Sequence, residues 1–214
     1  MAENNQTAAI ILASGFSKRF KSQCCSGASG MNKLLLPFHG KPLARYALEL
    51  VSSFDFSAGI FFVAASDAVA ALAGDLPGIR VIKNSAPEKG QRESVRLGVE
   101  AAAGAEAGYY MFFVCDQPFL DADTVGRILD ERQHGFIVEP SCREKPGNPC
   151  LFSEVFRVEL LSLKDGETPR LIKNRHKDKI KTVELANPLV LEDIDDKETL
   201  RRLSGFTIPG EKFL

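Results

Sequence analysis

Ala8-Ala9-Ile10-Ile11-Leu12-Ala13 is an unbroken apolar run near the start of the chain. Its length and its lack of polar alternation are typical of a strand that is covered on both faces, as in the centre of a parallel sheet. The next stretch, Ser14-Gly15-Phe16-Ser17-Lys18-Arg19-Phe20, combines small residues with two cations. Because small residues let backbone N–H groups turn toward a ligand, we expect an anion-binding loop here. The alternative is an ordinary turn with solvated cations.

Outward from this run, the chain alternates strand-like and helical segments. The strand-like runs are Ala8–Ala13, Ile60–Ala64, Arg80–Ile82, Tyr109–Val114, Phe136–Val138, Cys150–Phe152, Lys181–Leu185 and Pro188–Ile194. Helices are predicted near Pro42–Ser53, Ala68–Ala73, Gln91–Ala103, Asp121–Gln133, Glu154–Leu161 and Asp196–Leu203, and one more opens near Thr168-Pro169. This alternation predicts βαβ units and an α/β fold with a mostly parallel sheet. Ligands of such sheets bind beyond the carboxyl ends of the strands.

The composition is that of an ordinary globular protein. The chain has 214 residues, of which 44% are hydrophobic and 26% are charged, and a net charge of −1. We expect one domain over residues 1–214, no nucleic-acid partner, no membrane segment and a cytoplasmic location. The Lys-rich stretch Lys173 to Lys181 is interpreted as a solvated helix end and turn. Five cysteines without C-x-x-C spacing predict neither a disulfide framework nor a zinc site, and Cys115 is interpreted as a core residue.

The second informative stretch is Tyr110-Met111-Phe112-Phe113-Val114-Cys115-Asp116-Gln117-Pro118-Phe119, where a carboxylate follows a buried strand. Mg²⁺ prefers few carboxylates together with phosphate oxygens and water. A lone Asp116 at a strand end beside an anion-binding loop is therefore a candidate Mg²⁺ ligand. The alternative is a turn or helix-capping residue.

Two separated halves of one signature carry a family resemblance. The segment from Ala8 to Arg45 contains neither the P-loop pattern G-x-x-x-x-G-K-[ST] nor the dinucleotide-binding pattern G-x-G-x-x-G. It resembles the MobA-like nucleotidyltransferase signature, L-A-x-G-x-S-x-R-[MF]-G, then K-x-L-L-P-x-x-G-x-P, which here reads Leu12 to Phe20 and Lys33 to Pro42. Lys21 replaces the usual Gly, and the intervening spacer is long. The spacer, Lys21 to Asn32, has no periodic apolar face, so we expect it to be mobile without ligand.

Further segments are similar to the same family, most of all to its molybdenum cofactor cytidylyltransferases. The sequence Asp-Gln-Pro that begins at Asp116 is similar to the family's metal-binding motif. The segment Leu191–Leu200 is similar to the family's motif D-I-D-T-P-E-D-L. A strand followed by a capped helix would explain most of this segment, with Asp195 or Asp196 as the cap. Alternation along the strand places Asp193 and Asp195 on one face, and we prefer Asp193 as the second metal ligand and leave Asp195 as a cap. Three weaker matches are Gly90 to Gly98, Gly147 to Phe152 and Asp165 to Arg170.

The resemblance implies a Rossmann-like three-layer α/β/α nucleotidyltransferase that transfers CMP from CTP to the phosphate of molybdopterin, with Mg²⁺ as cofactor and pyrophosphate as product. The implied catalytic residues are Arg19, Lys33 and Asp116, and the implied metal ligands are Asp116 and Asp193. The implied substrate-binding residues are Leu12, Ala13, Ser14, Gly15, Ser17, Arg92, Ser94, Gly98, Gly147, Asn148, Pro149 and Arg170. A molybdenum hydroxylase would receive the product. The alternatives are GTP with molybdopterin, CTP with a sugar or polyol phosphate, and a non-catalytic cofactor-binding chaperone.

Overall fold

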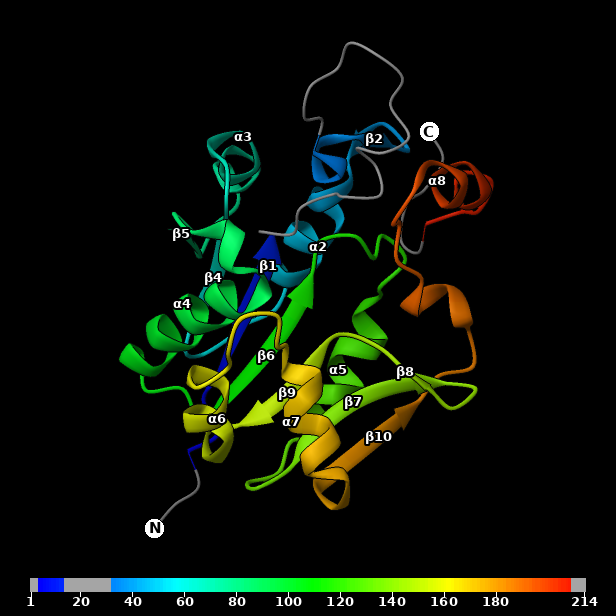
Figure 1. Cartoon of the computed structure of the whole chain (residues 1–214). Coiled ribbons are helices and arrows are strands. Elements are labelled where there is room, and N and C mark those ends of the chain that lie inside the picture. The colour runs from blue at the N-terminus through cyan, green and yellow to red at the C-terminus, as the bar shows by residue number, and fades with distance from the viewer. Residues whose placement is uncertain (1–3, 14–31, 209–214) are drawn as a thin grey trace.

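A twisted, mostly parallel sheet forms the middle of the molecule in the computed structural model, which describes residues 4–13 and 32–208 (Figure 1). The strands are β1 (Thr7–Ala13), β2 (Pro37–Phe38), β3 (Lys41–Pro42), β4 (Ile60–Ala64), β5 (Ile79–Lys83), β6 (Tyr109–Val114), β7 (Ile137–Cys142), β8 (Lys145–Pro146), β9 (Cys150–Ser153) and β10 (Ile180–Glu184). The main sheet has the order β10-β7-β9-β6-β1-β4-β5, with β8 beside β7. The expected α/β fold with a mostly parallel sheet is confirmed.

Strand β1 lies at the centre, as its apolar run predicts. It pairs in parallel with β4 on one side and with β6 on the other. Strand β9 is antiparallel to both of its neighbours, β6 and β7, whereas β10 is parallel to β7. The carboxyl ends of β1 and β6 therefore meet at one edge of the sheet, and this edge positions the candidate site.

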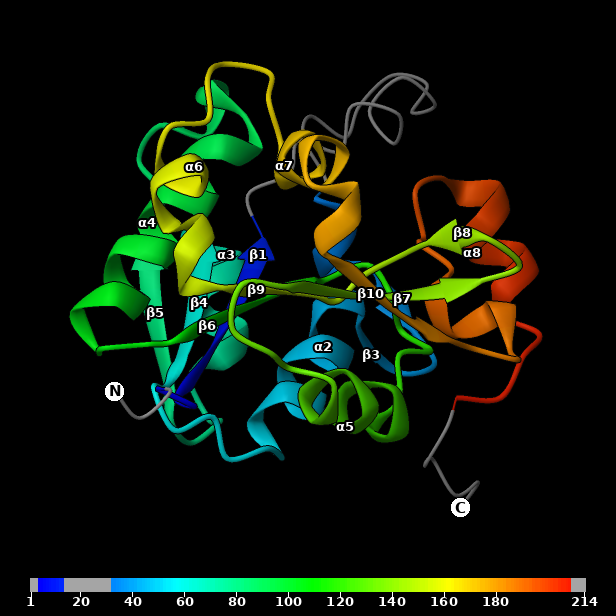
Figure 2. The ribbon, with the colours of Figure 1, turned by 90° about the horizontal axis from the view of Figure 1, so that it is seen from below.

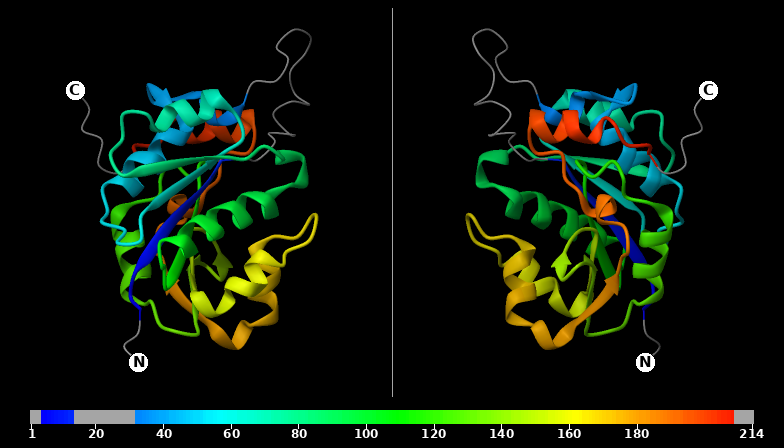
Figure 3. Two further views of the ribbon diagram at one scale, coloured as in Figure 1. Left: turned by 90° about the vertical axis from the view of Figure 1, so that its left-hand side faces the viewer. Right: turned by 90° about the vertical axis from the view of Figure 1, so that its right-hand side faces the viewer.

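The helices lie on both faces of this sheet (Figures 2 and 3). They are α2 (Leu43–Ser52), α3 (Asp67–Ala70), α4 (Gln91–Gly104), α5 (Ala122–Asp130), α6 (Arg157–Leu161), α7 (Pro169–Arg175) and α8 (Lys197–Leu203). Side chains alternate along β1: Ala9 and Ile11 pack in a core with α2 and α5, while Ala8 and Ile10 pack in a second core with α4, α6 and α7. The three-layer arrangement is therefore confirmed. No helix in the described residues is long and apolar enough to cross a membrane.

Short 3₁₀ turns connect several elements, namely η1 (Lys33–Leu35), η2 (Ala71–Ala73), η3 (Pro87–Lys89), η4 (Glu154–Phe156), η5 (Lys177–Lys179) and η6 (Pro188–Leu191). The stretch from Lys33 to Pro42 forms η1 and then the β2–β3 hairpin, whose turn includes Gly40 at φ +87°. Buried Phe38 in this hairpin packs edge-on against Tyr46 and Phe119. These contacts hold the start of the segment, and hence Lys33, near the end of β6.

The predicted strand Pro188–Ile194 is wrong. Residues 188–191 form η6, and residues 192–195 have no regular structure. The physical reason is local: Asn187 Oδ1 accepts a hydrogen bond from Leu189 N, and Pro188 has the φ angle that suits the first position of a helical turn. The segment runs past the end of β6, where Ile194 N donates to Asp116 O at 2.9 Å.

Candidate active site

Several predicted residues follow β1 directly and lie outside the described residues. These are Ser14, Gly15, Ser17 and Arg19, together with the spacer up to residue 31. Leu12 and Ala13 end β1 at the edge of the sheet where β6 also ends, Ala13 buried and Leu12 partly exposed. The described part of the site is therefore built on β6, η1, residues 192–195 and the elements around β9.

Lys33 joins two carboxylates that are far apart in the sequence. Its Nζ donates to Asp116 Oδ2 at 2.6 Å and to Asp195 Oδ1 at 2.8 Å. The Lys33 side chain is 12% exposed, and that of Asp116 is 18% exposed. Burial acts to lower the pKa of Lys33, but Asp116 and Asp195 outweigh it and raise this pKa. Lys33 is therefore held as an ammonium group against the end of β6.

Asp193 completes a group of three carboxylates. Its backbone runs beside Asp116, because Ile194 N donates to Asp116 O and Gln117 Nε2 donates to Leu191 O. Partial burial, followed by the charges of Asp116 and Asp195, raises the pKa of Asp193 to about 7, although Lys33 acts in the opposite direction. Among the residues that the structure describes, the one ammonium group of Lys33 lies with three carboxylates in this cluster, which we call the carboxylate end.

The carboxylate end fits a hard divalent cation. Within residues 4–13 and 32–208, no group of three or more His, Cys, Asp or Glu side chains has a metal-binding arrangement. Mg²⁺ does not require one, since it is commonly bound by one or two carboxylates with substrate phosphates and water. The donor set is the sign of the fit, because Asp116, Asp193 and Asp195 lie close enough to repel one another. Burial and this repulsion raise the pKa of Asp193, and a bound cation would offset the repulsion.

Of the two helix caps that the sequence offers, the structure has Asp196 and not Asp195, which the sequence interpretation leaves as a cap when Asp193 is preferred as a metal ligand. Asp196 Oδ1 accepts from Thr199 N at 2.7 Å and begins α8, whereas Asp195 contacts Lys33. The reason is that residues 192–195 are not a strand, so the alternation that related Asp193 to Asp195 does not apply. Asp193 and Asp195 nevertheless both lie close enough to interact with Asp116 or Lys33.

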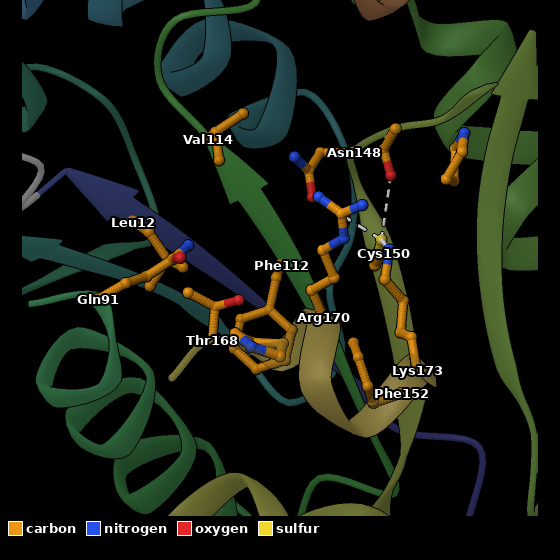
Figure 4. Close-up of a pocket in the computed structure, with 13 residues that line it drawn as sticks. Leu12, Gln91, Phe112, Val114, Asn148, Cys150, Phe152, Thr168, Arg170 and Lys173 are labelled. Carbon is orange, nitrogen blue, oxygen red and sulfur yellow. Dashed lines mark hydrogen bonds between the residues drawn. The ribbon is translucent and has the colours of Figure 1, made fainter. Parts of the chain in front are cut away.

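A pocket of about 330 Å³ lies beside the carboxyl half of β6 (Figure 4). It extends from the end of β1 to α7, and its apolar wall is formed mainly by Phe112, Val114 and Phe152. Its lining residues are Leu12, Gln91, Phe112, Val114, Pro146, Gly147, Asn148, Cys150, Phe152, Thr168, Pro169, Arg170 and Lys173. The structure thus brings Leu12, Gly147, Asn148 and Arg170 together around one pocket. Pro149 is buried next to Asn148.

Two buried side chains, Glu139 and Cys150, meet the partly buried Lys173 at the α7 end of the pocket. Lys173 Nζ donates to Glu139 Oε2 at 2.6 Å and contacts Cys150 Sγ at 3.4 Å, and the Cys150 thiol donates to Gly147 O at 3.1 Å. Burial raises the pKa of Cys150, which therefore remains a neutral thiol at neutral pH. Burial acts to lower the pKa of Lys173, yet Cys150 and Glu139 raise it overall. We call this group the lysine end.

The solvated position expected for Lys173 is therefore wrong. Its side chain is 15% exposed and its partner Glu139 is 10% exposed. Sequence reasoning missed the lysine end because Glu139, Cys150 and Lys173 lie on different elements, β7, β9 and α7. The one available signal was the spacing of Arg170 and Lys173, three residues apart on a predicted helix and hence on one face.

The residues predicted on α4 have structural partners in the protein. Ser94 is buried, and its Oγ accepts from Asn84 Nδ2 at 3.0 Å. Arg92 forms an ion pair with Asp165 and so connects α4 to the loop before α7. Gly98 packs so closely on Ile10 that an added Cβ would overlap its side chain. This contact explains the glycine by packing of α4 on β1, and its predicted role in binding stays a prediction.

Solved structures of low sequence identity share the fold. A nucleotidyl transferase from Methanothermobacter (Mth528) has a TM-score of 0.78 at 20% identity, over 94% of this chain and 97% of that one. Rv0371c from Mycobacterium tuberculosis H37Rv has a TM-score of 0.75 at 20% identity, over 95% of this chain and 100% of that one. Its complex with manganese has a TM-score of 0.70 at 19% identity, over 94% of this chain and 100% of that one. The CMP:2-keto-3-deoxy-manno-octonic acid synthetase complexed with CTP has a TM-score of 0.63 at 13% identity, over 93% of this chain and 96% of that one.

Among curated proteins, no significant sequence match is found. A family model does match, the MobA-like NTP transferase domain, over residues 9–180. The matched region begins in β1 and includes Lys33, Asp116 and the pocket with its two cations, Arg170 and Lys173. The chain therefore belongs to the MobA-like NTP transferase family, whose members are nucleotidyltransferases.

Proposed function

We propose that the protein transfers CMP from CTP to the phosphate of molybdopterin and releases pyrophosphate. The observation that carries this proposal is the arrangement of Lys33 and three carboxylates at the end of β6, next to a pocket whose charged lining residues, Arg170 and Lys173, are cations. A carboxylate end of this kind suits the metal-bound triphosphate of a nucleotide. The neighbouring pocket suits an anionic acceptor.

In the proposed reaction, an oxygen of the acceptor phosphate attacks the α-phosphorus of CTP. A new P–O bond forms, and the bond between the α-phosphorus and its bridging oxygen breaks, so that pyrophosphate leaves. The attacking phosphate is already an anion near neutral pH, and no general base is needed. Catalysis would then consist of positioning the two anions and of stabilising the charge that moves onto the pyrophosphate.

Asp116 and Asp193 would hold Mg²⁺, which when bound supplies positive charge to the reacting phosphates. Lys33 would contribute a further positive charge, and its two carboxylate contacts restrict the position of Nζ before substrate arrives. Gly15 and Arg19 would contact the triphosphate, as the family resemblance implies. Manganese in the complex of Rv0371c is in keeping with a divalent cation in this fold.

On the acceptor side, Asn148 and Arg170 line the pocket and would hold molybdopterin, with Phe112 and Phe152 against its apolar surface. The CTP bound by the octonic acid synthetase supports a cytidine nucleotide as the donor in this fold. A cytoplasmic location and a molybdenum hydroxylase as recipient of the product belong to the same proposal.

The experiment is an assay of pyrophosphate release with each of the four NTPs, with and without molybdopterin. We expect release with CTP and molybdopterin together, and background release when either is omitted. Faster release with GTP would overturn the donor, and release only with a sugar or polyol phosphate would overturn the acceptor. No release with any pair would favour the non-catalytic cofactor-binding protein.

A further inference from the structure

We propose that Lys173 determines acceptor specificity by binding a second anionic group of the acceptor, separate from the phosphate that reacts. This inference rests on the proposed function, because it assumes that the pocket holds the acceptor. The chemical class it points to is a phosphorylated compound with an apolar body and another anionic group, such as a carboxylate, a second phosphate or a thiolate.

The first argument is the position of the Lys173 ammonium group. It lines the pocket, yet its side chain is only 15% exposed, and Glu139 on the neighbouring β7 holds it at 2.6 Å. An ammonium group has three N–H donors. Glu139 and Cys150 account for two of these among the described residues, so one donor is available to a molecule in the pocket.

The second argument is charge. Arg170 and Lys173 are the charged residues among those that line the pocket, and both extend from α7 toward the Asn148–Cys150 segment (Figure 4). They lie three residues apart on one helix face, where like charges repel. Glu139 offsets one of the two charges. The pocket therefore keeps a net positive charge that an anionic ligand would neutralise.

The third argument is distance from the carboxylate end. Cys150, which contacts Lys173, is paired with Phe112 across the sheet. Asp116 lies four residues further along the chain, beyond the end of β6 at Val114, and a strand advances roughly 3.3 Å per residue away from the Phe112–Cys150 pair. A phosphate that reacts beside Asp116 is therefore not expected to contact Lys173 as well. A second group of the acceptor would have to do so, with Phe152 against the part between them.

The test compares two small probes by isothermal titration calorimetry with the full chain. Phenyl phosphate carries one anionic group, and 4-carboxyphenyl phosphate carries two at opposite ends of the same ring. We expect the wild type to bind 4-carboxyphenyl phosphate at least about tenfold more tightly. The titration needs neither CTP nor turnover, so its result is separate from that of the pyrophosphate assay.

The variant for this test is the double substitution Lys173→Met with Glu139→Gln. Lys173→Met alone would leave the buried Glu139 carboxylate without its partner and could prevent folding, whereas the double variant removes both charges together. We expect the double variant to bind the two probes equally. The control, Lys177→Met, removes an exposed lysine of η5 and should keep the full preference.

Two results would overturn the inference. One is a wild-type protein that binds both probes equally, which would mean that the pocket does not bind a second anion. The other is a double variant that keeps the preference, which would assign it to Arg170. Transfer to molybdopterin without any probe preference would leave the proposed function intact and reject Lys173 as the specificity determinant.

Discussion

The carboxylate end and the lysine end of the site both contain ion pairs between lysine and carboxylate, but the charges around these pairs have opposite signs. At the carboxylate end, one lysine lies among three carboxylates, whereas at the lysine end Glu139 pairs with Lys173 and a second cation, Arg170, lines the same pocket. Lys33 holds Asp116 and Asp195, and Glu139 holds Lys173, but neither contact involves all of the opposite charges nearby. The remaining charge is negative at one end and positive at the other. The difference indicates that the first end is suited to a cation carried with a nucleotide, and the second to an anionic acceptor.

The largest expected effect comes from removing charge at the carboxylate end. Asp116→Asn should reduce pyrophosphate release by about a hundredfold or more, since a bound metal supplies several kcal/mol to the transition state. The melting temperature should change by only a few degrees, because Lys33 keeps its contact with Asp195. The control is Asp123→Asn, an exposed carboxylate on α5. A variant that keeps more than about a tenth of wild-type turnover would reject Asp116 as a metal ligand.

A smaller effect is expected at Gly147, whose carbonyl oxygen accepts from the Cys150 thiol and which lies close to Leu191. Gly147 lines the pocket, and an added Cβ there would lie 2.8 Å from Leu191 Cδ2, just before the segment that carries Asp193. Gly147→Ala should cost about 1–3 kcal/mol of unfolding free energy through overpacking. It should also lower turnover severalfold by displacing that segment.

The matched control for Gly147 is Gly126→Ala on α5, where an added Cβ meets no atom within 4 Å. This substitution should be neutral or stabilising, since alanine favours a helix interior. The melting temperatures of the two variants are compared by thermal unfolding. Equal melting temperatures for the two variants would contradict close packing of Gly147 on Leu191.

The excess charge itself should be visible in the pH dependence of stability. The pKa of Asp193 is about 7 in the folded protein against an ordinary 3.8, so the folded state binds the proton more strongly. This contribution to stability is therefore present at low pH and is lost as the pH rises from about 4 to about 7. Without divalent cation, Asp193→Asn should melt above the wild type at pH 8, and this advantage should disappear toward pH 4.

With Mg²⁺ at pH 8, the wild type should instead melt above Asp193→Asn. The cation stabilises the wild type by binding the Asp193 carboxylate, and the variant lacks this ligand. Melting curves at pH 4 and pH 8, with and without Mg²⁺, test both statements. Identical pH profiles for wild type and Asp193→Asn would show that the carboxylate end has no excess charge at this residue.

The smallest effect concerns the choice of nucleotide. With Mg²⁺, CTP should raise the melting temperature more than GTP does at equal concentration, by a difference of a few degrees, through binding to the native state. The Asp116→Asn variant serves as the control and should lose most of the shift with both nucleotides. Equal shifts in the wild type would remove the preference for cytidylyl transfer.

Local patterns predicted most of the fold. The apolar run from Ala8 to Ala13 became the central strand β1, and Tyr109 to Val114 became its neighbour β6 with the predicted bounds. Such runs are informative because a strand covered on both faces must be apolar throughout. The placement of Asp116 after β6 followed from the same logic, as did the core position of Cys115, which is 2% exposed. The strand predicted at Pro188–Ile194 failed because Asn187 and Pro188 favour a turn, which outweighs a short apolar pattern.

Charge partners across the chain were decided by the tertiary structure alone. Lys33 and Asp195 are 162 residues apart, and Lys173 and Glu139 are 34 apart, so no local pattern links either pair. The family signature identified Lys33 and Asp116, but it contained no sign that Lys173 is buried against a carboxylate. By itself, the sequence determined which segments form strands and helices, because that depends on apolar periodicity and on turn residues. The fold decided which charges meet, because electrostatic interaction depends on distance and burial in space, and these exist only after the sheet has brought β6, β7 and β9 together.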